Sequence, residues 1–187
     1  MEFRKWLVAA AVTLLGASVA RADGKGEWQY SAIFGQGRMH IDADHFFTGQ
    51  NEKDDTDLLG TSVGYKLPSG ALFEAGYLWA EHADFGKDDD FISKQYYGGF
   101  GWQFESANGW RFRPSIGVTS FRLYNDARLL LDDNGTRHFW VTTTAPYAEV
   151  ALLHRLGRHF GMGAMVREMY GDFVHHRTWG LVMTFNF

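Results

Sequence analysis

Three charged residues, Glu74, Arg113 and Glu149, occupy matching positions on separate alternating segments, each about four or five residues from a tight turn. If these segments lie side by side, the spacing predicts that the three side chains meet at a similar depth. A charge in a dry interior costs several kcal/mol unless it is paired and hydrogen-bonded. We therefore expect an internal Glu74–Arg113–Glu149 network, which serves either as a gate or proton path, or as a plug that fixes the register.

Three further residues share the expected interior with this network. Gln103 is expected in the same layer, Arg111 one layer nearer the turns, and Arg167 near the opposite end. Together they predict an inward face that forms a polar core.

The stretch 40–45 has the residue types of a metal site. Alternation along an extended segment would place His40, Asp42 and Asp44 on one side, with His45 beside them. Imidazole and carboxylate ligands of this kind suit Zn or Cu. The stretch holds no complete ligand set, so a bound metal would need histidines from other loops.

The segment at the end of the sequence shows which element positions such residues. Residues 177–187 alternate with a period of two, which puts successive side chains on opposite faces of a strand. One face is small and mostly polar. The other carries the bulky apolar residues Trp179, Leu181, Met183, Phe185 and Phe187. This pattern is typical of a barrel strand with lipid outside and a packed lumen inside.

Eight segments along the chain alternate in this way. They are 27–35, 57–67, 71–80, 94–104, 110–121, 138–153, 159–170 and 177–187. Each approaches or exceeds the ~9–11 residues that a tilted strand needs to cross a bilayer. Short turns alternate with longer polar links, as in outer-membrane barrels. The sequence therefore predicts an all-β fold, an eight-stranded antiparallel up-and-down transmembrane β-barrel.

Two points in this pattern stay open. Pro146 and the threonines at 142–144 predict a bulge or an irregular start of the sixth strand. A soluble barrel of lipocalin type would also alternate, but its polar face should carry scattered Lys and Glu. Here that face is mainly Gly, Ser, Thr and Gln, which favours the membrane barrel. Eight strands enclose only their own side chains, so an open channel is not expected.

Residues 1–22 have the features of a secretory signal peptide, with a basic start, an apolar core and a small-x-small site at Ala20-Arg-Ala22. Cleavage there leaves 23–187 as one barrel domain; cleavage after Ala20 and a retained anchor are the alternatives. Removal of the signal changes the formal net charge from −4 to −6, and no basic patch indicates nucleic-acid binding. The lack of cysteine argues against a lipoprotein anchor and disulfides.

The longer links are the expected outer loops. Residues 36–56 carry a net charge of −3 and residues 81–93 a net charge of −4. Their carboxylates either share the divalent cations that hold anionic lipopolysaccharide together, or simply solvate the rim. No other cofactor is expected. The link 122–137 contains Leu129-Leu-Leu131 before an Asp-Asn-Gly turn, which predicts a hairpin whose edge pairs with another protein or packs on neighbouring loops. Its arginines suit lipopolysaccharide phosphates.

Length, strand number, signal sequence and the terminal Phe187 together resemble the small eight-stranded bacterial outer-membrane proteins: the OmpX/Ail group, the membrane domain of OmpA, and OmpW and OprH. The resemblance covers the expected mature chain and concerns its fold. It implies a place in the outer membrane with both termini periplasmic. It also implies contact with outer-membrane lipids, with lipopolysaccharide and with the barrel-assembly machinery, which recognises a C-terminal strand ending in Phe.

Two enzyme families share this architecture but not their motifs with the chain. Lipid A deacylases of PagL type carry His-x-Ser-Asn, whereas the nearest stretch here, His176 to Trp179, has Thr178 in place of Ser and no Asn. Lipid A palmitoyltransferases of PagP type carry an N-terminal amphipathic helix and an Asp-Ser pair, and neither is found. No spacing recommends Ser93, or Ser120 with a loop histidine, as a nucleophile.

The leading interpretation is a non-enzymatic outer-membrane barrel whose outer loops contact lipopolysaccharide or an external partner, in envelope integrity or adhesion. The alternatives are a lipid A-modifying enzyme of the outer leaflet, of deacylase or acyltransferase type, and a narrow pathway for small solutes.

Overall fold

The computed structural model describes residues 26–41, 52–81, 91–125, 130–131, 137–138, 140–172 and 174–187. The expected signal peptide at residues 1–22 and the loop residues Asp42, Asp44 and His45 lie outside the described residues. Within this part of the chain, no helix has the length and apolar character needed to cross a membrane.

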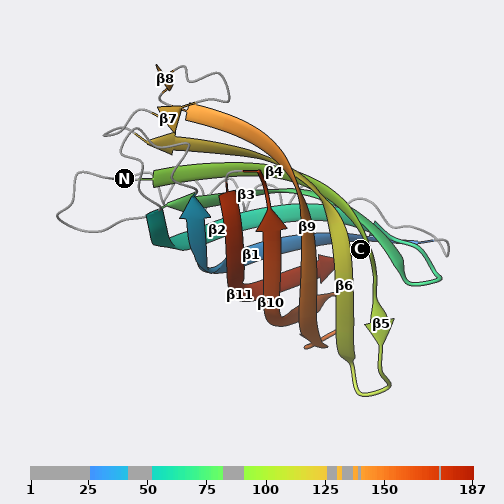
Figure 1. Cartoon of the computed structure of the whole chain (residues 1–187). Coiled ribbons are helices and arrows are strands. Elements are labelled where there is room, and N and C mark those ends of the chain that lie inside the picture. The colour runs from blue at the N-terminus through green and yellow to red at the C-terminus, as the bar shows by residue number, and fades with distance from the viewer. Residues whose placement is uncertain are drawn as a thin grey trace.

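The described chain is built from antiparallel strands that close into a barrel. Its strands are β1 (Glu27–Ile41), β2 (Glu52–Lys66), β3 (Ala71–Glu81), β4 (Phe91–Trp102), β5 (Phe104–Glu105), β6 (Trp110–Asn125), β9 (Trp140–Arg155), β10 (Phe160–Tyr170) and β11 (Val174–Asn186). The sheet closes because β1 pairs with β11 (Figure 1). With β5 counted as the continuation of β4, these residues form eight barrel strands, which confirms the predicted fold class.

The two ends of the barrel differ. The tight turns 67–70, 106–109 and 156–159 lie at one end, here called the turn end. At the other, the loop end, β1 finishes and β2 begins. The short strands β7 (Leu130–Leu131) and β8 (Arg137–His138) pair with each other at the loop end (Figure 1), as expected of a hairpin in this link.

The strand β11 closes the barrel against β1. Gln29 lies opposite Asn186, and the amide of Phe187 donates to the carbonyl oxygen of Trp28 at 2.9 Å. The apolar row of this segment faces outward: Trp179, Leu181, Met183, Phe185 and Phe187.

Large apolar side chains cover the outside of the barrel. Tyr96, Ile116 and Leu181 are 61%, 65% and 56% exposed, whereas the inward Leu72 and Leu153 are fully buried. A soluble protein seldom exposes so continuous an apolar surface. The outside is therefore suited to lipid, and the lipocalin-type alternative does not fit.

The two prolines of the sheet, Pro114 and Pro146, affect it differently. Trp102 ends β4 at the position opposite Pro114, and the strand is interrupted at Gln103 before β5 resumes in the same register. Proline has no amide hydrogen to donate across this step. The bulge expected at Pro146 is wrong, because β6 and β9 keep one register on both sides of it. The ladder between β9 and β10 ends at the adjacent Tyr147, so the missing amide disrupts no pairing there.

At the loop end, the strands extend beyond the apolar alternation. β1 continues to Ile41 rather than stopping at residue 35, and β2 begins at Glu52 rather than 57. Backbone hydrogen bonds need no apolar side chains, so the ladder continues where polar partners such as Arg38 and Asp55 replace lipid-facing residues.

The closing ladder includes two glycines that face each other, Gly35 and Gly180. A Cβ atom at Gly180 would lie 2.8 Å from Gly35 Cα, and one at Gly35 would lie 2.6 Å from Gly180 Cα. These distances are well below van der Waals contact. Only glycine therefore fits at this pair, here called the crease, without displacing the facing backbone.

We expect Gly180→Ala to lower the free energy of unfolding by about 1–3 kcal/mol, because the added methyl group must displace backbone. Urea titration of the barrel refolded in detergent micelles, followed by tryptophan fluorescence, measures this. Gly157→Ala is the matched control, since no atom lies within 4 Å of its added Cβ. The control should change the free energy by less than about 0.5 kcal/mol. An equal loss of unfolding free energy in the two variants would contradict the steric restriction at Gly180.

Candidate functional site

A buried ionic centre occupies the lumen, built by inward residues of β6, β9 and β10. Arg167 donates from Nε and Nη2 to Glu149 Oε2 at 2.9 and 2.6 Å. Arg113 Nη2 donates to Glu149 Oε1 at 3.2 Å. No side chain of the three is more than 2% exposed. One carboxylate therefore uses both oxygens to hold two guanidinium groups away from water.

Two tyrosines enclose the guanidinium of Arg167. Its central carbon lies 3.9 Å from the ring centroid of Tyr97 and 4.4 Å from that of Tyr147. Both distances are within cation–π range. Arg167 is on β10, Tyr147 on the adjacent β9 and Tyr97 on β4, so this contact links β10 to a strand that lies beyond β9 and β6 in the sheet.

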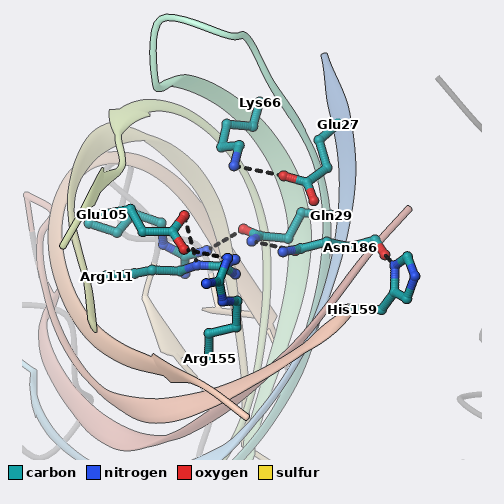
Figure 2. Close-up of polar contacts among 9 residues, drawn as sticks. Glu27, Gln29, Lys66, Glu105, Arg111, Arg155, His159 and Asn186 are labelled. Carbon is teal, nitrogen blue, oxygen red and sulfur yellow. Dashed lines mark hydrogen bonds and ion pairs between the residues drawn. The ribbon is translucent and has the colours of Figure 1, made fainter. Parts of the chain in front are cut away.

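The ionic centre also reaches the closing seam. Arg113 Nη1 donates to Gln29 Oε1 at 2.9 Å, and Gln29 Nε2 donates to Asn186 Oδ1 at 2.9 Å. Figure 2 shows Gln29 and Asn186 pointing toward each other from the two strands of the seam. The polar interior thus helps to hold β1 against β11.

The structure places Arg167 directly opposite Glu149 in the ladder between β9 and β10, rather than near the loop end. The expected position was counted from the ends of each strand. Barrel closure requires neighbouring strands to be staggered, so equal counts do not give equal depth.

Glu74 lies in the same interior but outside the hydrogen-bonded centre. Its side chain is 7% exposed, and within the described residues Oε1 has no hydrogen-bond partner. The charges of Arg113, Glu149 and Arg167 all act on this carboxyl group. Of the expected network of Glu74, Arg113 and Glu149, the structure hydrogen-bonds Arg113 to Glu149. The second hydrogen-bond partner of Glu149 is Arg167 instead of a residue of that network.

Gln103 and Arg111 lie at the turn end. Arg111 Nε is 3.3 Å from Glu105 Oε2, and Arg155 Nη1 is 3.1 Å from Glu105 Oε1 (Figure 2). Gln103 lies in the interruption between β4 and β5 and lines a cavity of about 400 Å³. It is therefore not in the layer of Glu74 that was expected.

An apolar layer fills the lumen toward the loop end, where a polar core was expected. Its inward side chains are at most 5% exposed: Met39, Ile41, Leu58, Phe121, Leu123, Met169 and Val174. A hydrated ion crossing this layer would lose its water without gaining polar partners. Within the described residues, the lumen therefore contains an ionic centre and, toward the loop end, a layer in which apolar side chains predominate.

His176 is buried beside this apolar layer. Gln95 Nε2 donates to Nδ1 at 2.8 Å, so Nε2 carries the ring proton and directs it at Thr56 Oγ1, 3.3 Å away. In that tautomer His176 does not act as a base toward Thr56. Thr178 is buried on the same inward face. The stretch nearest to the deacylase motif therefore places its histidine and hydroxyl inside the barrel.

The metal hypothesis for residues 40–45 stays a prediction. His40 lies in β1 near the loop end. Within the described ranges, no three or more His, Asp, Glu or Cys side chains form a group that could hold a metal ion.

Four interior residues of this site were not predicted from the sequence: Tyr97, Tyr147, Gln29 and Asn186. All four occupy inward positions of their strands, so alternation alone would have included them among the lumen residues. The residues that they contact could not be predicted from the sequence, because those contacts depend on the stagger between strands.

The closed antiparallel sheet, the apolar outside and the polar interior define the class: a small eight-stranded β-barrel with the fold of bacterial outer-membrane proteins. No protein-family model matches the chain, and no curated protein matches it in sequence.

Solved structures with this fold include three that align over 86–87% of this chain. Neisserial surface protein A is 12% identical over 87% of this chain and 97% of its own, with a TM-score of 0.66. The attachment invasion locus protein Ail of Yersinia pestis is 15% identical over 87% and 99%, with a TM-score of 0.60. The N-terminal β-barrel domain of Pseudomonas aeruginosa OprF is 19% identical over 86% and 97%, with a TM-score of 0.58. At these identities, the likeness establishes the fold alone.

We expect Glu149→Ala to lower the free energy of unfolding by about 3–5 kcal/mol, because it leaves Arg113 and Arg167 buried without their shared carboxylate. Urea unfolding in lipid vesicles measures the loss. Asp55→Ala is the control, since Asp55 pairs with Arg38 where both side chains are well exposed. The control should leave the unfolding midpoint unchanged. An unchanged midpoint for Glu149→Ala would show that the ionic centre is dispensable.

Proposed function

We propose that this chain is a sealed, non-enzymatic barrel of the outer membrane, whose loop end contacts lipopolysaccharide or an external partner in envelope integrity or adhesion. The observation that carries this proposal is the filled lumen. Because the interior is occupied, the surfaces left for binding are the outer wall and its rims.

The proposed orientation puts the turn end and both termini in the periplasm. Strands continue past the apolar band at the loop end, whereas the turn end finishes in tight turns. Long strands projecting on one side suit the cell surface, as in outer-membrane barrels. In this arrangement, the outward row from Trp179 to Phe187 is the segment offered to the barrel-assembly machinery.

Two features argue against an enzyme within the described residues. Ser93 is fully buried in the lumen, and the outward-facing Ser120 has no hydrogen bond to a histidine. His176 donates to Thr56 rather than accepting from it. A lipid A hydrolase needs a nucleophile, a base and an acid that reach the lipid together.

The loop end carries outward carboxylates that suit contact with an ion-rich surface. Asp57 lies opposite Glu81 between β2 and β3, and Asp55 is on the same face of β2. Such oxygen ligands can share the divalent cations that bridge lipopolysaccharide. Ail, similar in fold, was solved with the heparin analogue sucrose octasulfate. An external ligand on a barrel of this fold is therefore a precedent for the proposal.

We expect the purified barrel to give negligible steady conductance in planar bilayers, because the ionic centre and the apolar layer fill its lumen. Single-molecule current recording at moderate voltages measures this. A porin reconstituted in the same bilayer is the control for detection. A steady current carried by the wild-type protein would favour the narrow-pathway alternative.

We expect lipid A to have the same acyl pattern in cells with and without the protein, because no catalytic constellation among the described residues faces the lipid. Mass spectrometry of extracted lipid A decides this. Loss or gain of an acyl chain that depends on the protein would replace this proposal with the lipid-modifying alternative.

A further inference from the structure

A cavity of about 400 Å³ lies at the turn end of the lumen. It is bordered by the start of β1, the end of β2, the turn 67–70 and the interruption between β4 and β5. Ligand-binding cavities in proteins have volumes from roughly 300 Å³ upward. This cavity is therefore large enough for a small molecule, and it lies at the opposite end of the barrel from the outer loops.

The interruption between β4 and β5 shapes one side of the cavity. The ladder with β6 stops where Gly101 lies opposite Ser115 and resumes at Phe104. Between these points, the amide of Gln103 still donates to the carbonyl oxygen of Gly70 at 2.8 Å. Gln103 is therefore held by the β2–β3 turn on one side, and its side chain keeps the inward position that its place in the register gives it.

Charges of both signs border the cavity. Lys66 lies opposite Glu27 in the ladder between β1 and β2, and Lys66 Nζ is 2.6 Å from Glu27 Oε2. Glu105 of β5 forms a second group with Arg111 and Arg155, and Figure 2 shows the two groups on different sides of the mouth. Side chains of Glu27, Lys66 and Glu105 remain 19–33% exposed. An ammonium has three donors and a carboxylate several acceptor positions, so each can bind a further group.

The carboxamide of Gln103 adds a third kind of contact. This side chain borders the cavity and is only 5% exposed. Within the described residues, neither its Nε2 nor its Oε1 has a hydrogen-bond partner. A buried amide without partners is unfavourable. Its adjacent donor and acceptor match the C=O and N–H of a peptide group, which points to a ligand that contains an amide.

We propose that the turn-end cavity binds a short zwitterionic peptide of about the size of a dipeptide. The α-ammonium of the ligand lies at the carboxylates of Glu27 and Glu105, and its carboxylate lies at the ammonium of Lys66. Its peptide group pairs with the carboxamide of Gln103. The inference goes beyond the proposed function, which concerns the loop end, and either can hold without the other.

The test titrates the purified barrel in detergent micelles with alanyl-alanine and measures the heat of binding by isothermal titration calorimetry. Free alanine carries both charges but lacks the peptide group, and N-acetyl-alanine methylamide has peptide groups but no charge. We expect saturable binding of the dipeptide. Each of the other two probes should bind about tenfold more weakly or worse, because each lacks contacts that the dipeptide makes.

Two variants separate the contacts. Glu27→Gln/Lys66→Met removes the ion pair without changing the net charge, and it should weaken dipeptide binding by about tenfold or more. Gln103→Met removes the carboxamide and should abolish the preference for the dipeptide over alanine. Arg38→Gln/Asp55→Asn is the matched control, since it removes an exposed ion pair at the loop end and also conserves the net charge. The control should bind as the wild type does. Heat-dependent gel mobility verifies folding of each variant.

The site is overturned if the wild-type barrel gives no saturable heat with millimolar dipeptide. Unchanged affinity in Glu27→Gln/Lys66→Met, or an equal loss in the control variant, overturns it as well. Equal affinity of the wild type for the dipeptide and the uncharged probe would show that the charges at the mouth recognise nothing. Equal affinity for the dipeptide and alanine would remove the role of Gln103, whether or not its variant folds. These outcomes leave the contact proposed at the loop end untouched.

Discussion

A single carboxylate organises the interior of this barrel. Glu149 accepts hydrogen bonds from Arg167 on one side and Arg113 on the other, and it does so where water is excluded. Such a centre is tolerable only when its members are held in fixed geometry, because a misplaced guanidinium would be buried without a partner. The register of β6, β9 and β10 is therefore fixed from inside. Through Gln29 and Asn186, the same constraint reaches the seam that closes the sheet.

The outer wall is organised by a different rule. The middle of the outer surface is an apolar band suited to lipid. The charged residues of this surface lie at the ends of the strands. At the loop end these charges form rows across neighbouring strands, as where Arg38 and Arg177 lie between Asp55 and Glu168.

Much of the fold could be predicted from the sequence, because alternation depends only on the two faces of a strand. The outward row of β11 is visible in the sequence as Trp179 to Phe187. The ends of the strands were harder to predict, since the ladder continues beyond lipid at Ile41 and Glu52, where apolar alternation has stopped. The break at Gln103 depends on its cross-strand neighbour Pro114, which no single segment reveals.

The interior could be predicted only in part. Buried charges at Arg113 and Glu149 were evident, because Arg and Glu stand among small polar residues. Which charges meet depends on the stagger of the strands, and this is why Arg167 rather than Glu74 completes the centre. The apolar layer around Phe121 and Leu123 was missed for another reason. Apolar residues on both faces of a strand weaken the alternation that identifies the inward one.

The facing glycines at the β1–β11 seam have a counterpart across the barrel. Gly99 lies opposite Gly117 where β4 meets β6, and a Cβ at Gly117 would lie 2.7 Å from Gly99 Cα. Four strands separate the two creases in either direction around the wall. The wall thus has, on two sides, a pair of facing glycines at which an inward Cβ would meet the neighbouring backbone. Between these two sides, Arg167 of β10 reaches Tyr97 of β4 across the lumen, so the two halves of the sheet are joined by a side chain as well as by the ladders that contain the glycines.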